Sequence, residues 1–162
     1  MPAAMVALAN LTLGSAQASV TFASIPSTYR DLRLIVNAAT SAEGNLNIQV
    51  NGDTGANYSY VNMRGFSTTS NAASAGSGSN IQSNYSTGLQ TSSRAINTYD
   101  FLDSSATDKH KIILLRANHT DEVDATSGRW ASTSAITSIL IASGGGNFTT
   151  GSTFALYGIV SA

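Results

Sequence analysis

The sequence predicts an all-β fold, an antiparallel β-sandwich of the jelly-roll type, and three observations support this prediction. Short runs alternate apolar and polar residues, most clearly at residues 45–51, NLNIQVN, and a period of two is that of a half-buried strand. Turn-forming residues such as Asn51-Gly52 separate these runs. No stretch shows a sustained helical period. About nine or ten short strands separated by turns are typical of two packed antiparallel sheets.

The first half of the chain is expected to supply at least five strands. Residues 11–22 predict an edge strand, a turn at Gly14-Ser15 and a second strand. Pro26 interrupts pairing because proline has no amide donor. Residues 31–38 predict the next strand, and residues 45–66 predict a strand, a turned loop and another strand.

The second half is expected to alternate loops with strands. Residues 67–80 are rich in small polar residues without apolar periodicity, so a flexible loop is expected there. Residues 109–118 form the most apolar run and predict a central strand buried on both sides. Residues 119–126 are expected to form a polar, acidic loop. The remaining strands are expected within residues 81–89, 95–102, 135–142 and 148–160.

Composition limits the classes of function. The chain has 162 residues, enough for one domain with a real core. Charged residues make up only 10%, and the formal net charge is −1, so the chain lacks the basic stripe that binds nucleic acid. A surface of Ser, Thr, Asn and Gly is weakly protected against association, which favours contact with other subunits. Cysteine is absent, so disulfides and thiolate zinc sites are excluded.

The N-terminus is mildly apolar, but it has no basic segment, and Asn10 and Thr12 interrupt it. A signal peptide or a membrane span is therefore not expected. We expect residues 1–10 to form an extended N-terminal arm, with a first strand as the alternative, and residues 11–162 to form the sandwich domain.

Two acidic segments are candidates for a calcium site, because carboxylate and amide oxygens suit a hard cation. The first contains His119, Asp121, Glu122 and Asp124. It lacks the glycine and distal glutamate of an EF-hand, so a solvated or subunit-contacting loop is favoured. In the second, Asp53 and Asn57 more simply stabilise a turn through their own backbone. We therefore predict no metal and no cofactor.

No catalytic constellation stands out, so the sequence does not predict an enzyme. A nucleophile with a base and an orienting acid would be needed. His110 lies between Lys109 and Lys111 in a predicted strand, where a cross-strand partner is the simplest interpretation. Sugar binding is the stronger alternative, because jelly rolls often bind glycans on aromatic platforms. Its candidate contacts are Tyr58, Tyr60 and Trp130, although core packing is the favoured role for Trp130.

Three phrases of the sequence support a resemblance. They are S-x-x-F-x-x-I-P-x-x-Y-x-D-L, N-G-D-x-x-x-N-Y and F-x-L-Y-G-I. The matching residues are Ser19, Phe22, Ile25, Pro26, Tyr29, Asp31, Leu32, Asn51, Gly52, Asp53, Asn57, Tyr58, Phe154, Leu156, Tyr157, Gly158 and Ile159. In these phrases the chain resembles a widespread family of tailed-bacteriophage virion proteins. The resemblance covers most of residues 11–159 and departs at residues 67–80 and 119–126.

The resemblance implies a β-sandwich in a virion, without enzymatic activity. The first expectation is a capsid decoration, or cement, protein that sits on the outer head surface as a homotrimer and bridges major capsid subunits. The residues expected to contact the shell or a neighbour are Met5, Val6, Leu8 and Leu11 of the arm. The alternative is a tail or tail-fibre module that binds host surface glycan through Tyr58, Tyr60 and Trp130. No nucleic acid or membrane partner is expected.

Overall fold

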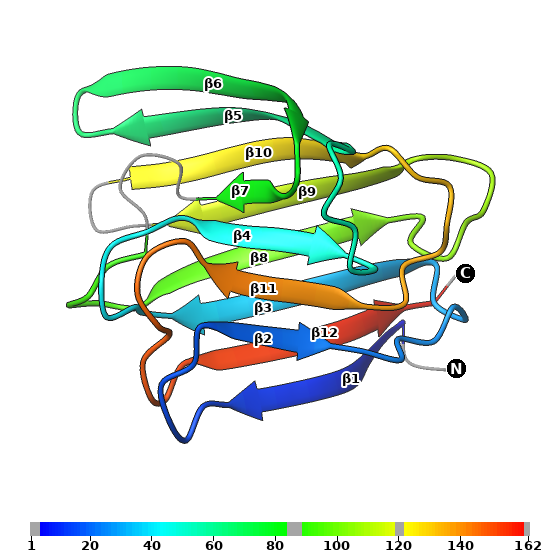
Figure 1. Ribbon diagram of the computed structural model, residues 1–162, viewed down its shortest axis with the longest axis horizontal. Helices are drawn as coiled ribbons and strands as arrows, with labels where there is room; N and C mark the ends of the chain where they lie inside the picture. The colour runs from blue at the N-terminus through cyan, green and yellow to red at the C-terminus, as the bar shows by residue number, and fades with distance from the viewer. Residues whose placement is uncertain (1–3, 84–88, 119–121, 161–162) are drawn as a thin grey trace.

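The computed structural model describes residues 4–83, 89–118 and 122–160, and within them it shows twelve strands and no helix (Figure 1). The strands are β1 (Met5–Thr12), β2 (Ser19–Phe22), β3 (Asp31–Ala38), β4 (Leu46–Val50), β5 (Tyr58–Phe66), β6 (Thr69–Gly78), β7 (Ile81–Ser83), β8 (Ala95–Leu102), β9 (Lys111–Asn118), β10 (Glu122–Trp130), β11 (Ile139–Ser143) and β12 (Thr153–Ile159). The predicted all-β class is therefore confirmed.

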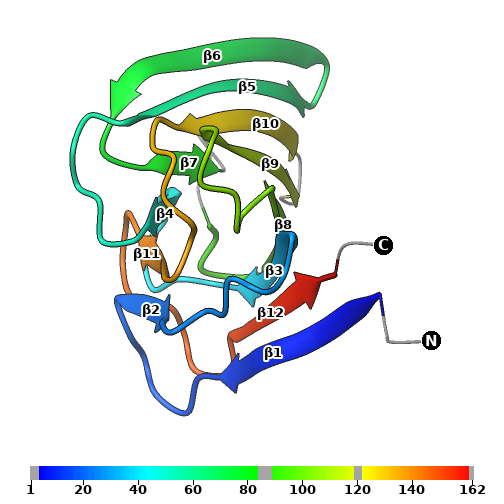
Figure 2. The ribbon, with the colours of Figure 1, turned by 90° about the vertical axis from the view of Figure 1, so that its right-hand side faces the viewer.

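The strands form two antiparallel sheets that pack face to face. The large sheet has eight strands in the order β1-β12-β3-β8-β9-β10-β5-β6, and the small sheet has four in the order β2-β11-β4-β7. Figure 2 shows the small sheet against one face of the large sheet. We call that face of the large sheet the inner face and the opposite one the outer face. The predicted antiparallel sandwich is confirmed.

Alternation along each strand builds the core between the sheets. In β3, Leu34 and Val36 are buried, while Arg33 and Ile35, which alternate with them, are only partly buried. Ile48 of β4 is fully buried in the same core. A strand with a period of two places successive side chains on opposite faces, so each of these strands contributes one row to a shared interior.

The phrases that carry the family resemblance serve this fold. The ring of Tyr29, from the first phrase, lies so close to Gly158, from the third, that a β-carbon at Gly158 would overlap it. Asn51, from the second phrase, adopts a positive φ of 53°. Its side-chain oxygen accepts the backbone N–H groups of Thr137 and Ser138 at 2.8 and 3.1 Å. Residues of these phrases therefore form a close contact between distant segments and stabilise a turn.

The predicted extended arm is not what the structure shows for the described part of residues 1–10. Met5–Thr12 is instead the edge strand β1, paired antiparallel with β12, with Met5 opposite Ile159 and Leu11 opposite Phe154. Leu8 packs against the core. The apolar residues that suggested an arm thus form a strand because β12 offers a full row of backbone partners.

The expected flexible loop at residues 67–80 is wrong. Thr69–Gly78 forms β6, which pairs with β5 through a tight turn at Ser67, whose φ is +52°. Its side chains lack apolar alternation because β6 is an edge strand, largely exposed on both faces. Without a buried face, nothing imposes the period of two on the sequence.

Two further predictions in the second half are corrected. The expected loop at residues 119–126 is part of β10 from Glu122 onward, and residues 119–121 lie outside the described residues. The strand at residues 109–118 exists as β9, but only one of its faces is buried, because Ile112 and Leu114 are exposed. The small sheet covers only the inner face of the large sheet (Figure 2), so outward side chains receive no cover.

Candidate functional site

The outer face of the large sheet carries large apolar side chains in contact with solvent. Their exposed fractions are 52% for Val61, 61% for Met63, 52% for Ile96, 47% for Ile112, 41% for Leu114 and 64% for Val123. Single exposed apolar residues are ordinary on a protein surface, whereas a contiguous group marks an interaction site. The outer face is therefore the first candidate for a functional surface.

Strand register brings three of these side chains, Val61, Met63 and Leu114, together around a hollow. Ser127 of β10 lies between Val61 of β5 and Leu114 of β9 in one row. In the next row, Ala125 lies between Met63 and Arg116. Because the central strand carries small residues and its neighbours carry large ones, the surface is recessed along β10. The resulting cavity has a volume of about 590 Å³.

Arginine makes the outer face basic, although the whole chain carries a formal charge of −1. Arg33 of β3 makes a bidentate contact with Asp100 of β8, at 2.6 Å from Nε and 3.0 Å from the second guanidinium nitrogen. This hydrogen bond and the charge of Asp100 raise the pKa of Arg33. Arg116 and Arg129 also point outward and are exposed, and neither forms an ion pair with any described residue.

This combination of charge and apolar surface selects the kind of partner. On the outer face, Asp100 neutralises Arg33, whereas Arg116 and Arg129 have no ion-pair partner among the described residues. Complementary potentials across an interface favour the correct partner and suppress wrong ones. The matching surface is therefore apolar and acidic.

The predicted contact residues of the N-terminus lie on β1, at the edge of the large sheet. Met5 and Leu11 are exposed, whereas Val6 and Leu8 are half-buried. The hollow is lined by residues of β3, β8, β9, β10 and β5, and β12 separates β1 from the nearest of these strands, β3. The structure therefore does not bring these residues together with the apolar patch.

The predicted glycan platform is contradicted by burial. Tyr58, Tyr60 and Trp130 are only 1%, 7% and 3% exposed, so they form no open aromatic patch. All three occupy inward positions of β5 and β10. Their alternation with outward residues such as Ser59 and Val61 was the signal that they face the core.

Asp53 stabilises a turn, as the sequence predicted in preference to a calcium site. Its carboxylate accepts hydrogen bonds from Trp130 Nε1 at 2.7 Å, from Asn57 Nδ2 at 2.9 Å and from the Gly55 N–H at 2.9 Å. These donors, led by Trp130, lower the pKa of Asp53. Both carboxylate oxygens thus receive protein donors, which ties the loop to β10.

The candidate metal cluster is not assembled in the described part of the chain. Glu122 and Asp124 are buried at inward positions of β10, and Glu122 lies 3.4 Å from an Arg64 nitrogen. His119 and Asp121 lie outside the described residues. Among the residues that are described, no group of three or more His, Asp or Glu side chains is placed to hold a metal ion.

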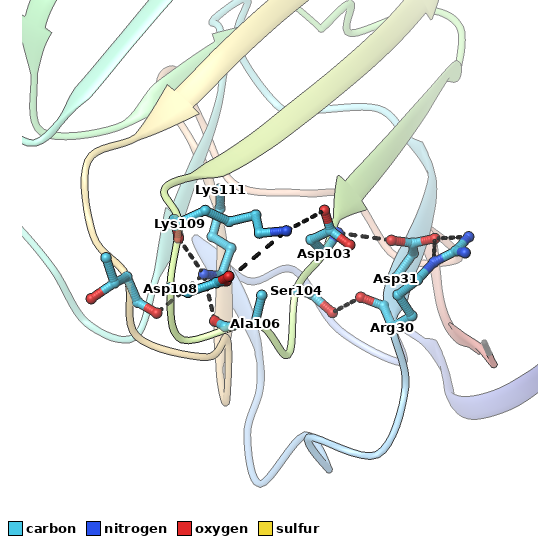
Figure 3. A network of polar contacts seen from close by, with 9 residues as sticks. Arg30, Asp31, Asp103, Ser104, Ala106, Asp108, Lys109 and Lys111 are labelled. Atoms are coloured by element: carbon cyan, nitrogen blue, oxygen red, sulfur yellow. Dashed lines mark hydrogen bonds and ion pairs between the residues drawn. The ribbon is translucent and has the colours of Figure 1, made fainter.

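Lys111, the residue after His110, is buried, which was not predicted from the sequence. Lys111 Nζ donates to the carbonyl oxygens of Ala106, Lys109 and Thr133 at 2.7, 2.9 and 3.2 Å (Figure 3). Burial lowers the pKa of Lys111, and nearby acidic groups partly offset that effect. Lys111 and Ile113 are two residues apart in one strand, so their side chains point to the same face, and this spacing indicated that Lys111 is buried. The ammonium group fixes two loops, and its three bonded donors leave it no free proton to offer a substrate.

Comparisons with other proteins concern the architecture. Comparison with protein-family models and with curated proteins finds no match. Among solved structures, the galectin LEC-6 of Caenorhabditis elegans is 15% identical, with 90% of this chain and 94% of that chain covered and a TM-score of 0.43. The alginate lyase Aly36B, solved as a mutant with an alginate tetrasaccharide, is 8% identical, with 94% and 81% covered and a TM-score of 0.35. At these sequence identities and TM-scores, neither structure indicates an activity for this protein. No described helix is long and apolar enough to cross a membrane.

Proposed function

We propose that this protein is a bacteriophage virion structural protein, most specifically a capsid decoration protein. It binds the outer head surface as an oligomer, expected to be a trimer, and bridges major capsid subunits. The sequence phrases described above support the virion assignment. The observation that carries the docking role is the exposed apolar and basic outer face, which no other element of the described chain covers.

The outer face supports binding through two interactions, burial of apolar side chains and ion pairing. Burying a Leu or Met side chain that is otherwise exposed contributes about 1.5–3 kcal/mol. Leu114 and Met63 border the hollow, so they are the apolar anchors of the proposed contact. Arg116, which lies across Ala125 from Met63, meets a carboxylate of the partner. A decoration protein that binds only the assembled shell then stabilises that shell by mass action.

The partner is the shell protein in this proposal because the outer face does not match itself. In two copies placed outer face to outer face, each face would offer Arg116 and Arg129 a surface that carries the same two cations without ion-pair partners among the described residues. Like charges brought together at an interface cost free energy. An acidic, apolar surface of a major capsid subunit avoids that repulsion.

The test measures binding of the purified protein to heads that lack it. We expect the double variant Met63→Ser/Leu114→Ser to bind at least about tenfold more weakly, since tenfold corresponds to about 1.4 kcal/mol. Arg116→Ser should also weaken binding and reduce its dependence on salt. Arg94→Ser, which removes the same charge from an exposed loop position, is the matched control and should bind normally.

Localisation gives an independent readout. Gold-labelled antibody should decorate the head of intact virions at many copies. Normal head binding by the outer-face variants would overturn the docking site. Label confined to the tail would overturn the capsid role and leave the tail-module alternative, whose three proposed aromatic contacts are already buried.

A further inference from the structure

The two outermost strands of the large sheet each have a free side. β1 and β6 lie at opposite edges of that sheet (Figure 1). In the described residues, β1 pairs only with β12, and β6 pairs only with β5. Because alternate residues of an antiparallel edge strand direct their N–H and C=O groups away from the neighbour, each free side presents a row of backbone donors and acceptors.

These two edges are long and uncharged. Proteins protect an edge by keeping it short, by bulges in the strand, or by placing charged residues or proline on it. The small sheet follows this rule, because its edge strands β2 and β7 have four and three residues. In contrast, β1 (MVALANLT) has eight residues and β6 (TSNAASAGSG) has ten, with no charge and no proline in either. The register of β1 shifts between Ala7 and Ala9, which leaves Ala9–Thr12 as its longest regular stretch.

The two edges also differ from each other in a complementary way. β6 consists of Ala, Ser, Gly, Asn and Thr, so no large side chain hinders the approach of another strand. It runs in regular register from Thr69 to Ala75, and its irregularity lies beyond that point. β1 instead carries Met5 and Leu11, large apolar residues that are exposed in this chain.

We propose that β6 of one copy pairs with β1 of a second copy, so that the large sheets of neighbouring subunits join edge to edge. The continuous sheet keeps outward residues on one side, which brings Met5 onto the same face as Val61 and Met63 of the neighbouring copy. Pairing of β6 with another β6 would leave β1 unpaired and Met5 and Leu11 exposed. The head-to-tail arrangement covers both edges with one type of contact.

A head-to-tail contact is heterologous, so it closes into a ring when the rotation between copies permits. This inference goes beyond the proposed function, because it requires neither a capsid nor the outer-face hollow. In such a ring the outer faces of all copies remain available. Self-association through the edges and docking through the face therefore involve different residues and can fail separately.

The first experiment measures the mass of the full-length protein in solution by size-exclusion chromatography with light scattering. Wild type should elute as a closed oligomer. Ala72→Lys on β6 and Asn10→Lys on β1 each place a charge on one edge at an exposed position, and each should shift the protein to the monomer. Ala56→Lys, an exposed loop position, is the matched control and should leave the oligomer intact. Circular dichroism checks that each variant is folded.

Mixing the two edge variants distinguishes the possible pairings. Ala72→Lys retains an intact β1 and Asn10→Lys retains an intact β6, so an equimolar mixture should form a one-to-one dimer and nothing larger. A monomeric wild type would overturn the proposal. So would an Asn10→Lys variant that still dimerises alone, because that result would indicate pairing between two β6 strands. Unchanged assembly of both folded edge variants would also exclude the edges as the contact.

Discussion

The two faces of β9 carry similar side chains in very different surroundings. Ile113 on the inner face is 0% exposed, whereas its neighbour Leu114 on the outer face is 41% exposed. Both residues are aliphatic, and they are adjacent in the sequence. The difference arises only because the small sheet covers the inner face and nothing in the described chain covers the outer one (Figure 2).

This comparison separates stability from recognition within one strand. Inward positions have fixed partners, and even the polar Lys111 has three carbonyl acceptors. Outward positions have solvent on one side, so their apolar surface gains cover only from another molecule. We therefore expect substitutions on the inner face to change the free energy of unfolding, and substitutions on the outer face to change binding.

The largest expected effect comes from the matched pair Ile113→Ala and Leu114→Ala. Truncating a buried Ile removes transfer free energy and leaves a cavity, so Ile113→Ala should cost about 2–5 kcal/mol. Leu114→Ala should stay within about 0.5 kcal/mol, as surface substitutions usually do. Urea unfolding followed by Trp130 fluorescence measures both. Equal losses for the two variants would mean that the outer face is already covered in solution.

A smaller effect is expected for Lys111→Met, which keeps an unbranched apolar side chain and removes the ammonium group. Three carbonyl oxygens then lose a charged donor, at a cost on the order of 2 kcal/mol. Lys109→Met is the control, because Lys109 is half-exposed and its ion pairs are on the surface. A Lys111→Met variant as stable as wild type would contradict a structural role for the buried cation.

The sequence predicted the strands that have one covered face. The strands β3 (Asp31–Ala38) and β8 (Ala95–Leu102) occur at the predicted residues, because burial of one face imposes alternation. The sequence failed at β6, which has no covered face, and at the start of β10, where Glu122 and Asp124 are polar residues in inward positions. Local polarity indicated loops there, and pairing with β5 and β9 decided otherwise.

The candidate site was harder to predict than the strands. The run of Ile and Leu in β9 predicts burial on both sides, since a sequence shows apolar residues but not which face a second sheet covers. The hollow depends on the register that places Ser127 between Val61 and Leu114, three segments far apart in the chain. Core packing, the favoured prediction for Trp130, is confirmed, whereas the alternative glycan role of Tyr58 overlooks the inward phase of this residue in its strand.

The smallest expected effect concerns Asp53, which lies in the loop between β4 and β5 and accepts the Trp130 N–H. Asp53→Asn retains the shape of the side chain and removes its charge, which should cost about 1 kcal/mol at neutral pH. The folded-state pKa of Asp53 is lowered from 3.8. Its charged form therefore stabilises the folded state above the unfolded pKa, and this contribution disappears as the pH falls through the lower folded pKa.

The difference in unfolding free energy between wild type and Asp53→Asn should thus be full at pH 7 and shrink below about pH 4. Comparing the two proteins cancels the titration of the other carboxylates. Urea unfolding at neutral and acidic pH measures the difference directly. A difference that persists unchanged at acidic pH would mean that side-chain geometry, rather than charge, holds the turn to Trp130. In that case shape, rather than charge, would hold the structure together at this position, as it does at Ile113.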